Sequence, residues 1–250
     1  MNQHFEDHVE DIAQASREGR APRDHGPYGL LVGDGNLHFR PVVVADPVPT
    51  GEQILTAAEL RPVREHLLFQ VLTNGTIREV QPEDLVDLRA PGLEKFLAFH
   101  DDRIYRMTLD NRSVDWGSQW ITGRVLKILA GVNPDDMDVV LLHPQGQNRV
   151  VSDDDRVDLS EPGVERFETV RISIEIFVNT ASHTVHQRVM DYWAIVRLEY
   201  PQAEPCRELE SYTVTYTKGP KQNPSGTLIK GQSVHLKQGM EFDVFLTDRS

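Results

Sequence analysis

Two stretches of this 250-residue chain repeat the same short motifs in the same order. A Thr-Gly pair at Thr50 is followed 12 positions later by Pro62, and a Thr-Gly pair at Thr122 is followed 12 positions later by Pro134. Both copies continue with Val-Asp-Leu (86–88 and 157–159) and with Pro-Gly-x-Glu-[Lys/Arg]-Phe (91–96 and 162–167). Agreement in order, residue type and spacing indicates an internal duplication.

A third, more diverged copy occupies the last part of the chain. Val234-His235-Leu236 stands in place of Val-Asp-Leu, and Gly239 stands in place of Pro-Gly. Upstream, Ile172, Ile174, Ile176 and Val178 alternate with other residues, which predicts a strand with one buried face. Residues 179–182 are expected to form a turn, and residues 184–189 are expected to return as the hairpin partner.

Each copy also predicts one helix followed by further strands. Helices are expected to begin at three good N-cap residues: Thr50, Thr122 and Asp191. Gln53 completes a capping box with Thr50. Closing strands are expected over 95–100, 166–170 and 240–246. One amphipathic helix across a four- or five-stranded sheet buries both apolar faces, so each copy predicts a β-grasp unit.

The chain is therefore predicted to be α+β, with three tandem β-grasp domains over 28–101, 102–170 and 171–250 after an N-terminal extension, 1–27. The junctions at 99–103 and 169–171 are short and lack Gly/Ser-rich character, which predicts a semi-rigid rod.

Charge and apolar content narrow the classes of partner. The net charge of -13 and pI of about 5.2 disfavour nucleic acids and anionic membranes. No apolar run reaches the ~20 residues of a membrane helix, and the polar N-terminus has no secretory pattern, so a cytoplasmic location is expected.

The repeated motifs, together with Tyr212-Thr213-Val214-Thr215-Tyr216 and the segment from Gly231 to Ser250, resemble the bacterial multi-ubiquitin proteins over roughly residues 28–250. The resemblance implies ubiquitin-like domains encoded beside an activating enzyme, a conjugating enzyme and often a metallopeptidase, in systems of antiphage defence. It implies that the C-terminus is activated and transferred to a target protein, with Thr247, Asp248, Arg249 and Ser250 as the conjugation tail. It also implies that the exposed sheet face usually carries recognition.

This ending departs from eukaryotic ubiquitin, because no Gly-Gly pair is present and the tail is expected to run about four residues beyond the last strand. A non-covalent alternative therefore stays open, in which the protein is a scaffold or filament subunit that organises partner enzymes. Lysines are also scarce in the first two copies, where only Lys95 and Lys127 occur. Either compositional preference for Arg or poor provision for lysine-linked chains accounts for this scarcity.

The N-terminal extension has two interpretations. Phe5, Val9 and Ile12 fall at helical spacing and form a possible assembly arm that docks on a neighbouring molecule and supports a homo-oligomer. Alternatively, the segment is a disordered leader or a helix lying on its own first domain.

No catalytic residue, metal site or cofactor is predicted, so the protein is not expected to be an enzyme. His183 and His186 lack a carboxylate or Cys at ligand spacing. Residues 153–155 lack the Gly and Glu of a calcium loop. Cys206 is the only cysteine and has no residue placed to activate it.

Overall fold

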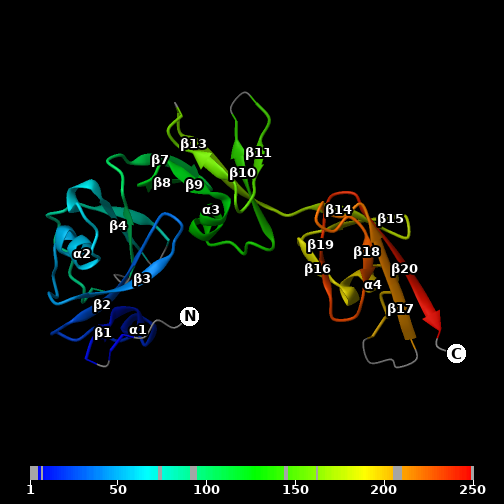
Figure 1. Cartoon of the computed structure of the whole chain (residues 1–250), viewed down its shortest axis with the longest axis horizontal. Coiled ribbons are helices and arrows are strands. Elements are labelled where there is room, and N and C mark those ends of the chain that lie inside the picture. Colours follow the sequence, from blue (N-terminus) through cyan, green and yellow to red (C-terminus); the bar gives the residue numbers. More distant parts are fainter. Residues whose placement is uncertain are drawn as a thin grey trace. The chain divides into compact units, whose positions relative to one another are not determined.

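The computed structural model describes residues 5–6, 8–72, 75–90, 95–143, 146–161, 163–204 and 210–248, with only the backbone described at Glu210 and Asp248. The N-terminal extension contributes β1 (Glu10–Asp11) and α1 (Ile12–Arg17). Three β-grasp modules follow along the chain (Figure 1).

The first module runs from β2 to β6. Its elements are β2 (Tyr28–Gly33), β3 (Phe39–Val44), α2 (Gly51–Ala57), the 3-10 helix η1 (Val63–Glu65), β4 (Leu67–Val71), β5 (Ile77–Val80) and β6 (Lys95–Phe99).

The second module runs from β7 to β13. Its elements are β7 (Tyr105–Leu109), β8 (Arg112–Trp116), β9 (Trp120–Thr122), α3 (Gly123–Ala130), β10 (Met137–Leu142), β11 (Arg149–Val151), β12 (Arg156–Asp158) and β13 (Glu165–Arg171).

The third module runs from β14 to β20. Its elements are β14 (Ile174–Val178), β15 (Ala181–Val185), β16 (Val189–Asp191), α4 (Tyr192–Glu199), β17 (Glu210–Thr217), β18 (Gly226–Leu228), β19 (Ser233–His235) and β20 (Met240–Asp248).

The three main sheets share one strand order, which confirms the predicted α+β class and the tandem β-grasp fold. The orders are β3-β2-β6-β4-β5, β8-β7-β13-β10-β11 and β15-β14-β20-β17-β18. In each sheet the last strand lies at the centre, parallel to the first strand of its module. Such a central parallel pair requires a crossover connection, and the helix of each module supplies it.

Local chemistry explains where the helices begin. Thr50 accepts from the backbone N–H of Gln53, whose side chain accepts from Thr50 in return, so the predicted capping box is present. Thr122 and Asp191 cap α3 and α4 in one direction only, because their side chains accept from the backbone N–H of Val125 and Ala194. Gly131 ends α3 with a left-handed φ of 69°, a conformation that glycine adopts without strain.

The hairpin of the third module is tighter than predicted. Its turn consists of Asn179 and Thr180 alone, with φ of 46° and 71°, and the returning strand begins at Ala181 instead of at residue 184. Asp110 and Asn111 form the same kind of turn in the second module, with φ of 48° and 62°. Both central residues of such a turn need positive φ, which matches the twist of a two-residue hairpin.

By contacts, the chain divides into two compact units. The first unit comprises residues 1–131 and 139–169, and the second comprises 132–138 and 170–250. The first two modules fall in one unit because Phe69, Leu97 and Phe99 belong to the same apolar cluster as the core of the second module. The domain boundaries expected from the sequence stay predictions.

Candidate functional site

The predicted conjugation tail is partly an element of the sheet. β20 continues to Asp248, so the expectation that the strand ends at residue 246 is wrong: Thr247 pairs with Ser211, and Asp248 pairs with Glu210. The strand continues because β17 offers backbone partners along its whole length. The hydroxyl groups of Thr213 and Thr247 also lie 3.2 Å apart. Arg249 and Ser250, the other two predicted tail residues, lie outside the described residues.

The last residues of β20 have little core packing. Phe245 and Leu246 are both exposed, whereas Phe242 and Val244 are buried. The end of the strand is therefore held mainly by its pairing with β17.

The predicted assembly arm lies on the first module of its own chain. Val9 and Ile12 are buried, and β1 pairs with the start of β2 in parallel. The ring of Phe5 covers Gly29, where an added Cβ would lie 2.7 Å from that ring. This placement matches the second interpretation of the extension, and docking on a neighbour would require the arm to be displaced.

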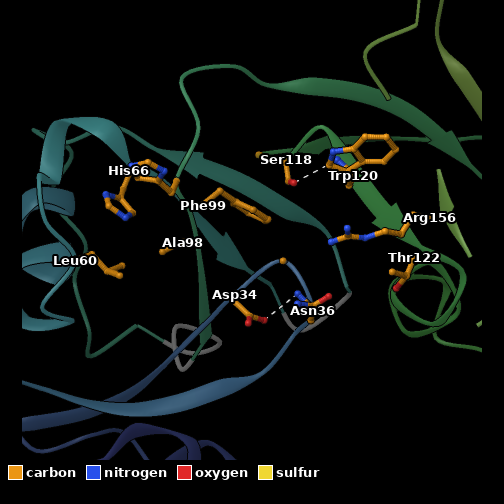
Figure 2. Close-up of a pocket in the computed structure, with 13 residues that line it drawn as sticks. Asp34, Asn36, Leu60, His66, Ala98, Phe99, Ser118, Trp120, Thr122 and Arg156 are labelled. Carbon is orange, nitrogen blue, oxygen red and sulfur yellow. Dashed lines mark hydrogen bonds between the residues drawn. The ribbon is translucent and has the colours of Figure 1, made fainter. Parts of the chain in front are cut away.

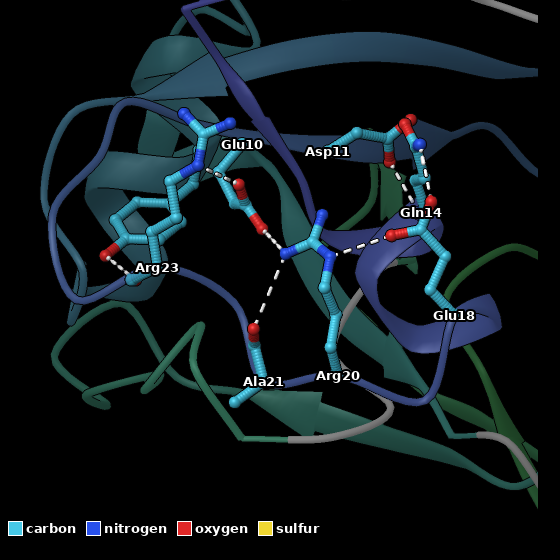
Figure 3. A network of polar contacts seen from close by, with 8 residues as sticks. Glu10, Asp11, Gln14, Glu18, Arg20, Ala21 and Arg23 are labelled. Atoms are coloured by element: carbon cyan, nitrogen blue, oxygen red, sulfur yellow. Dashed lines mark hydrogen bonds and ion pairs between the residues drawn. The ribbon is translucent and has the colours of Figure 1, made fainter.

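A buried carboxylate holds the arm in place. Glu10 is only 1% exposed and forms ion pairs with Arg20 and Arg23, the latter at 2.8 Å (Figure 3). The hydrogen bond to Glu10, followed by the bond to Glu18, raises the pKa of Arg20. A hydrogen bond from Gln14, and then one from Arg20, lowers the pKa of Glu18. Arg20 and Arg23, which precede β2, therefore connect the segment leading into that strand to Glu10 of the arm.

The outer sheet face of the first module is covered by the second module. Phe99 meets Trp116 edge-on, with ring centroids 4.8 Å apart. A Cβ on Gly117 would lie 2.5 Å from the ring of Phe99 and 2.9 Å from that of Phe69. The glycine therefore permits a close approach of the two modules, and this face of the first module is not free for recognition.

A cleft of about 360 Å³ opens beside this contact within the first unit (Figure 2). Leu60 and Ala98 contribute apolar surface, and Trp120, which is 43% exposed, stands on the side of the second module. The guanidinium group of Arg156 points into the space between Trp120 and Asn36. His66 and His100 also line the cleft, with ring centroids 4.9 Å apart.

Sequence reasoning missed Phe99, Gly117, Trp120 and Arg156 as interface residues. The sequence contains one signal for Phe99: a Phe stands three positions after the Phe of the repeated motif in two copies, as Phe99 after Phe96 and Phe245 after Phe242. The partners of Phe99 depend on tertiary contact and could not be read from spacing.

The two lysines of the first unit differ in accessibility. Lys127 is only 1% exposed and its Nζ lies 2.8 Å from Asp153, whereas Lys95 is exposed. Because attack on an activated carboxyl group requires an accessible amine, Lys127 is unsuited as an acceptor in the folded protein.

The remaining polar candidates serve structure. His186 contacts the carbonyl oxygen of Ile172 at 2.7 Å, and Asp155 accepts from the backbone N–H of Ser152. Cys206 lies outside the described residues. No three His, Cys, Asp or Glu side chains among the described residues are grouped to hold a metal ion. In the same part of the chain, no helix is long and apolar enough to cross a membrane.

Comparison with known proteins agrees with the repeated topology. No curated protein matches the chain. The Multiubiquitin family profile matches three consecutive segments, residues 36–101, 105–172 and 174–248, which together cover most of the sequence and reach the end of β20. The chain is a tandem ubiquitin-like protein and belongs to the Multiubiquitin family.

Proposed function

We propose that this protein is a ubiquitin-like modifier of a bacterial conjugation system, activated at its C-terminus and transferred to a target protein. An activating enzyme and a conjugating enzyme are the proposed partners, and a metallopeptidase is the proposed deconjugating enzyme. The protein contributes recognition, and the partner enzymes contribute the chemistry.

The supporting observation is that the family match extends through β20, the strand that leads into the proposed tail. An activating enzyme draws its substrate tail into a narrow channel as an extended, unpaired segment. The pairs of β17 with Leu246, Thr247 and Asp248 must therefore open before activation. The exposure of Phe245 and Leu246 keeps the burial lost in this opening small.

Co-expression with the candidate activating and conjugating enzymes, followed by mass spectrometry, tests the proposal. The expected product is an adduct that retains Ser250 in an isopeptide or ester bond. The purified activating enzyme is expected to catalyse ATP–pyrophosphate exchange when this protein is added. Absence of both signals with enzymes that are active on another substrate contradicts the proposal.

A disulfide across the two strands tests the opening step. Ser211 and Thr247 are direct cross-strand partners, and such pairs lie within the range that a disulfide spans. Ser211→Cys/Thr247→Cys in a Cys206→Ser background is expected to block exchange when oxidised and to restore it when reduced. The Cys206→Ser protein alone is the control. Exchange by the oxidised protein shows that the strand need not open.

A non-covalent scaffold is the second candidate function. The shared core of the first two modules favours it, because a fixed pair of modules presents a larger rigid surface than either module alone. The expected result is a stable complex with the partner enzymes, free of any covalent adduct. Deleting residues 1–20 is a poor test of the scaffold, because Ile12 belongs to the apolar core of the first module and its loss would destabilise that module. Point variants on the surface are the better test.

A role in antiphage defence is the proposed setting. Cells that carry the complete gene cluster are expected to resist phage, and deletion of this gene is expected to abolish that resistance. Equal plaque counts with and without the gene contradict the setting while leaving the biochemical proposal open to its own test.

A further inference from the structure

Phe245 is exposed at a position that is buried in the first module. The closing strands align through Phe96 and Phe242, and the aromatic residue three positions later is Phe99 in one module and Phe245 in the other. Phe99 is 4% exposed because the second module covers it, whereas Phe245 is 58% exposed. A large aromatic side chain on an open sheet face is the residue type that dominates binding interfaces.

The surroundings of Phe245 are polar and acidic. Asp243 and Thr247 lie two residues to either side on the same face of β20, and Thr213 is its direct partner on β17. Both Asp243 and Thr247 are exposed. A surface complementary to this one offers an apolar hollow for one aromatic ring next to a cationic group.

The cleft of the first unit has that composition. Leu60, Ala98 and Trp120 provide apolar surface, and the volume of about 360 Å³ exceeds that of one aromatic side chain. Arg156 is exposed and makes no salt bridge to a described residue, so its guanidinium is open to a carboxylate from outside. Asp34, the acidic residue of the cleft, already accepts from the backbone N–H groups of Asn36 and His38.

We propose that Phe245 of one copy inserts into the cleft of the first unit of a second copy, with Asp243 facing Arg156. The two surfaces differ, so the contact is heterologous and joins successive copies head to tail. It leaves the N-terminal arm on its own module. The inference does not rest on activation of the tail, since the contact is non-covalent.

Sedimentation velocity of the full chain over a wide concentration range tests the contact. The wild-type protein is expected to form higher species as its concentration rises. Phe245→Ser, Arg156→Glu and Asp243→Arg are each expected to weaken association by more than about 10-fold, as the loss of a central anchor or a charge pair does. Arg156→Glu combined with Asp243→Arg restores opposite charges and is expected to restore association.

Two matched variants separate this contact from general surface effects. Ile229→Ser removes an apolar side chain of similar exposure, 56%, from the third module, and Arg103→Glu reverses an exposed charge in the first unit. Both are expected to associate as the wild type does, and circular dichroism checks the fold of every variant. A monomeric wild type at all concentrations, or wild-type association by Phe245→Ser, overturns the inference. Conjugation is measured separately, by mass spectrometry of the covalent adduct, so a failure of this contact is distinguishable from a failure of the proposed function.

Discussion

At the scale of single residues, Glu10 is a charged side chain that folding removes from water. Its two arginine partners remain partly exposed, at 41% and 59%, so the free energy of the network is smaller than that of a fully buried ion pair. Glu10→Gln is expected to lower the free energy of unfolding by about 1–3 kcal/mol, since it weakens charge-assisted hydrogen bonds.

Chemical denaturation measures the effect of Glu10→Gln, and limited proteolysis reports release of the arm. Glu83→Gln is the control, because Glu83 is an exposed carboxylate in a turn of the same module, away from the Arg20–Glu10 network; a change within about 0.5 kcal/mol is expected. Equal stability of the Glu10→Gln and wild-type proteins would show that the arm is held by apolar packing alone.

Asp158 provides a prediction about pH. Hydrogen bonds from the side chain and then the backbone N–H of Ser160, and one from Gln119, lower the pKa of Asp158 in the folded protein. Because the folded pKa lies below the unfolded value of about 3.9, these bonds stabilise the protein above that pH. Their contribution is lost as the pH falls through the folded pKa.

The melting temperature of Asp158→Asn is therefore expected to be lower than that of the wild type near neutral pH. The difference is expected to shrink on acidification below the unfolded pKa. Melting curves over a pH series measure this. Asp154→Asn, an exposed change in the neighbouring turn, is expected to follow the wild type at every pH. A constant difference between Asp158→Asn and wild type would exclude the carboxylate as its source.

At the scale of elements, the segment after β8 decides how closely the first two modules pack. Gly117→Ala places a methyl group against the rings of Phe99 and Phe69, with a backbone φ that is not in the left-handed region. Overpacking of this kind is expected to cost about 1–3 kcal/mol. Denaturant titration of the full chain measures the loss, and Phe99→Leu in the same chain is expected to recover part of it. Unchanged stability of Gly117→Ala would show that the modules adjust freely at this contact.

The elements also show why local sequence signals succeeded for the helices and failed for the strand ends. A helix start is specified by side chains within one turn, as the Thr50–Gln53 capping box illustrates. The end of β20 depends on β17, whose residues lie more than 30 positions earlier in the chain. The two-residue turn at Asn179 is predictable from the sequence, since Asn is a residue type that tolerates positive φ.

At the scale of the whole molecule, two cooperative units are expected instead of three. The first two modules share apolar contacts around Phe99 and Gly117. In the next repeat, Val170 stands in place of Phe99, and His186 stands in place of Gly117. Calorimetry of the full chain is therefore expected to resolve two unfolding transitions. Gly117→Ala is expected to shift one of them and to leave the other in place. Three transitions, or a shift of both, would contradict the shared core.

The sequence alone was sufficient for the repeat, the β-grasp fold of each copy and the three helix starts, because these depend on spacing and on side chains close together in the chain. Tertiary structure decided which sheet face is covered, where the N-terminal arm lies, that Lys127 is enclosed, and that Thr247 and Asp248 are paired. Each of these outcomes depends on surfaces that meet only after the modules have formed, and the apolar alternation of a strand does not specify what will cover its second face.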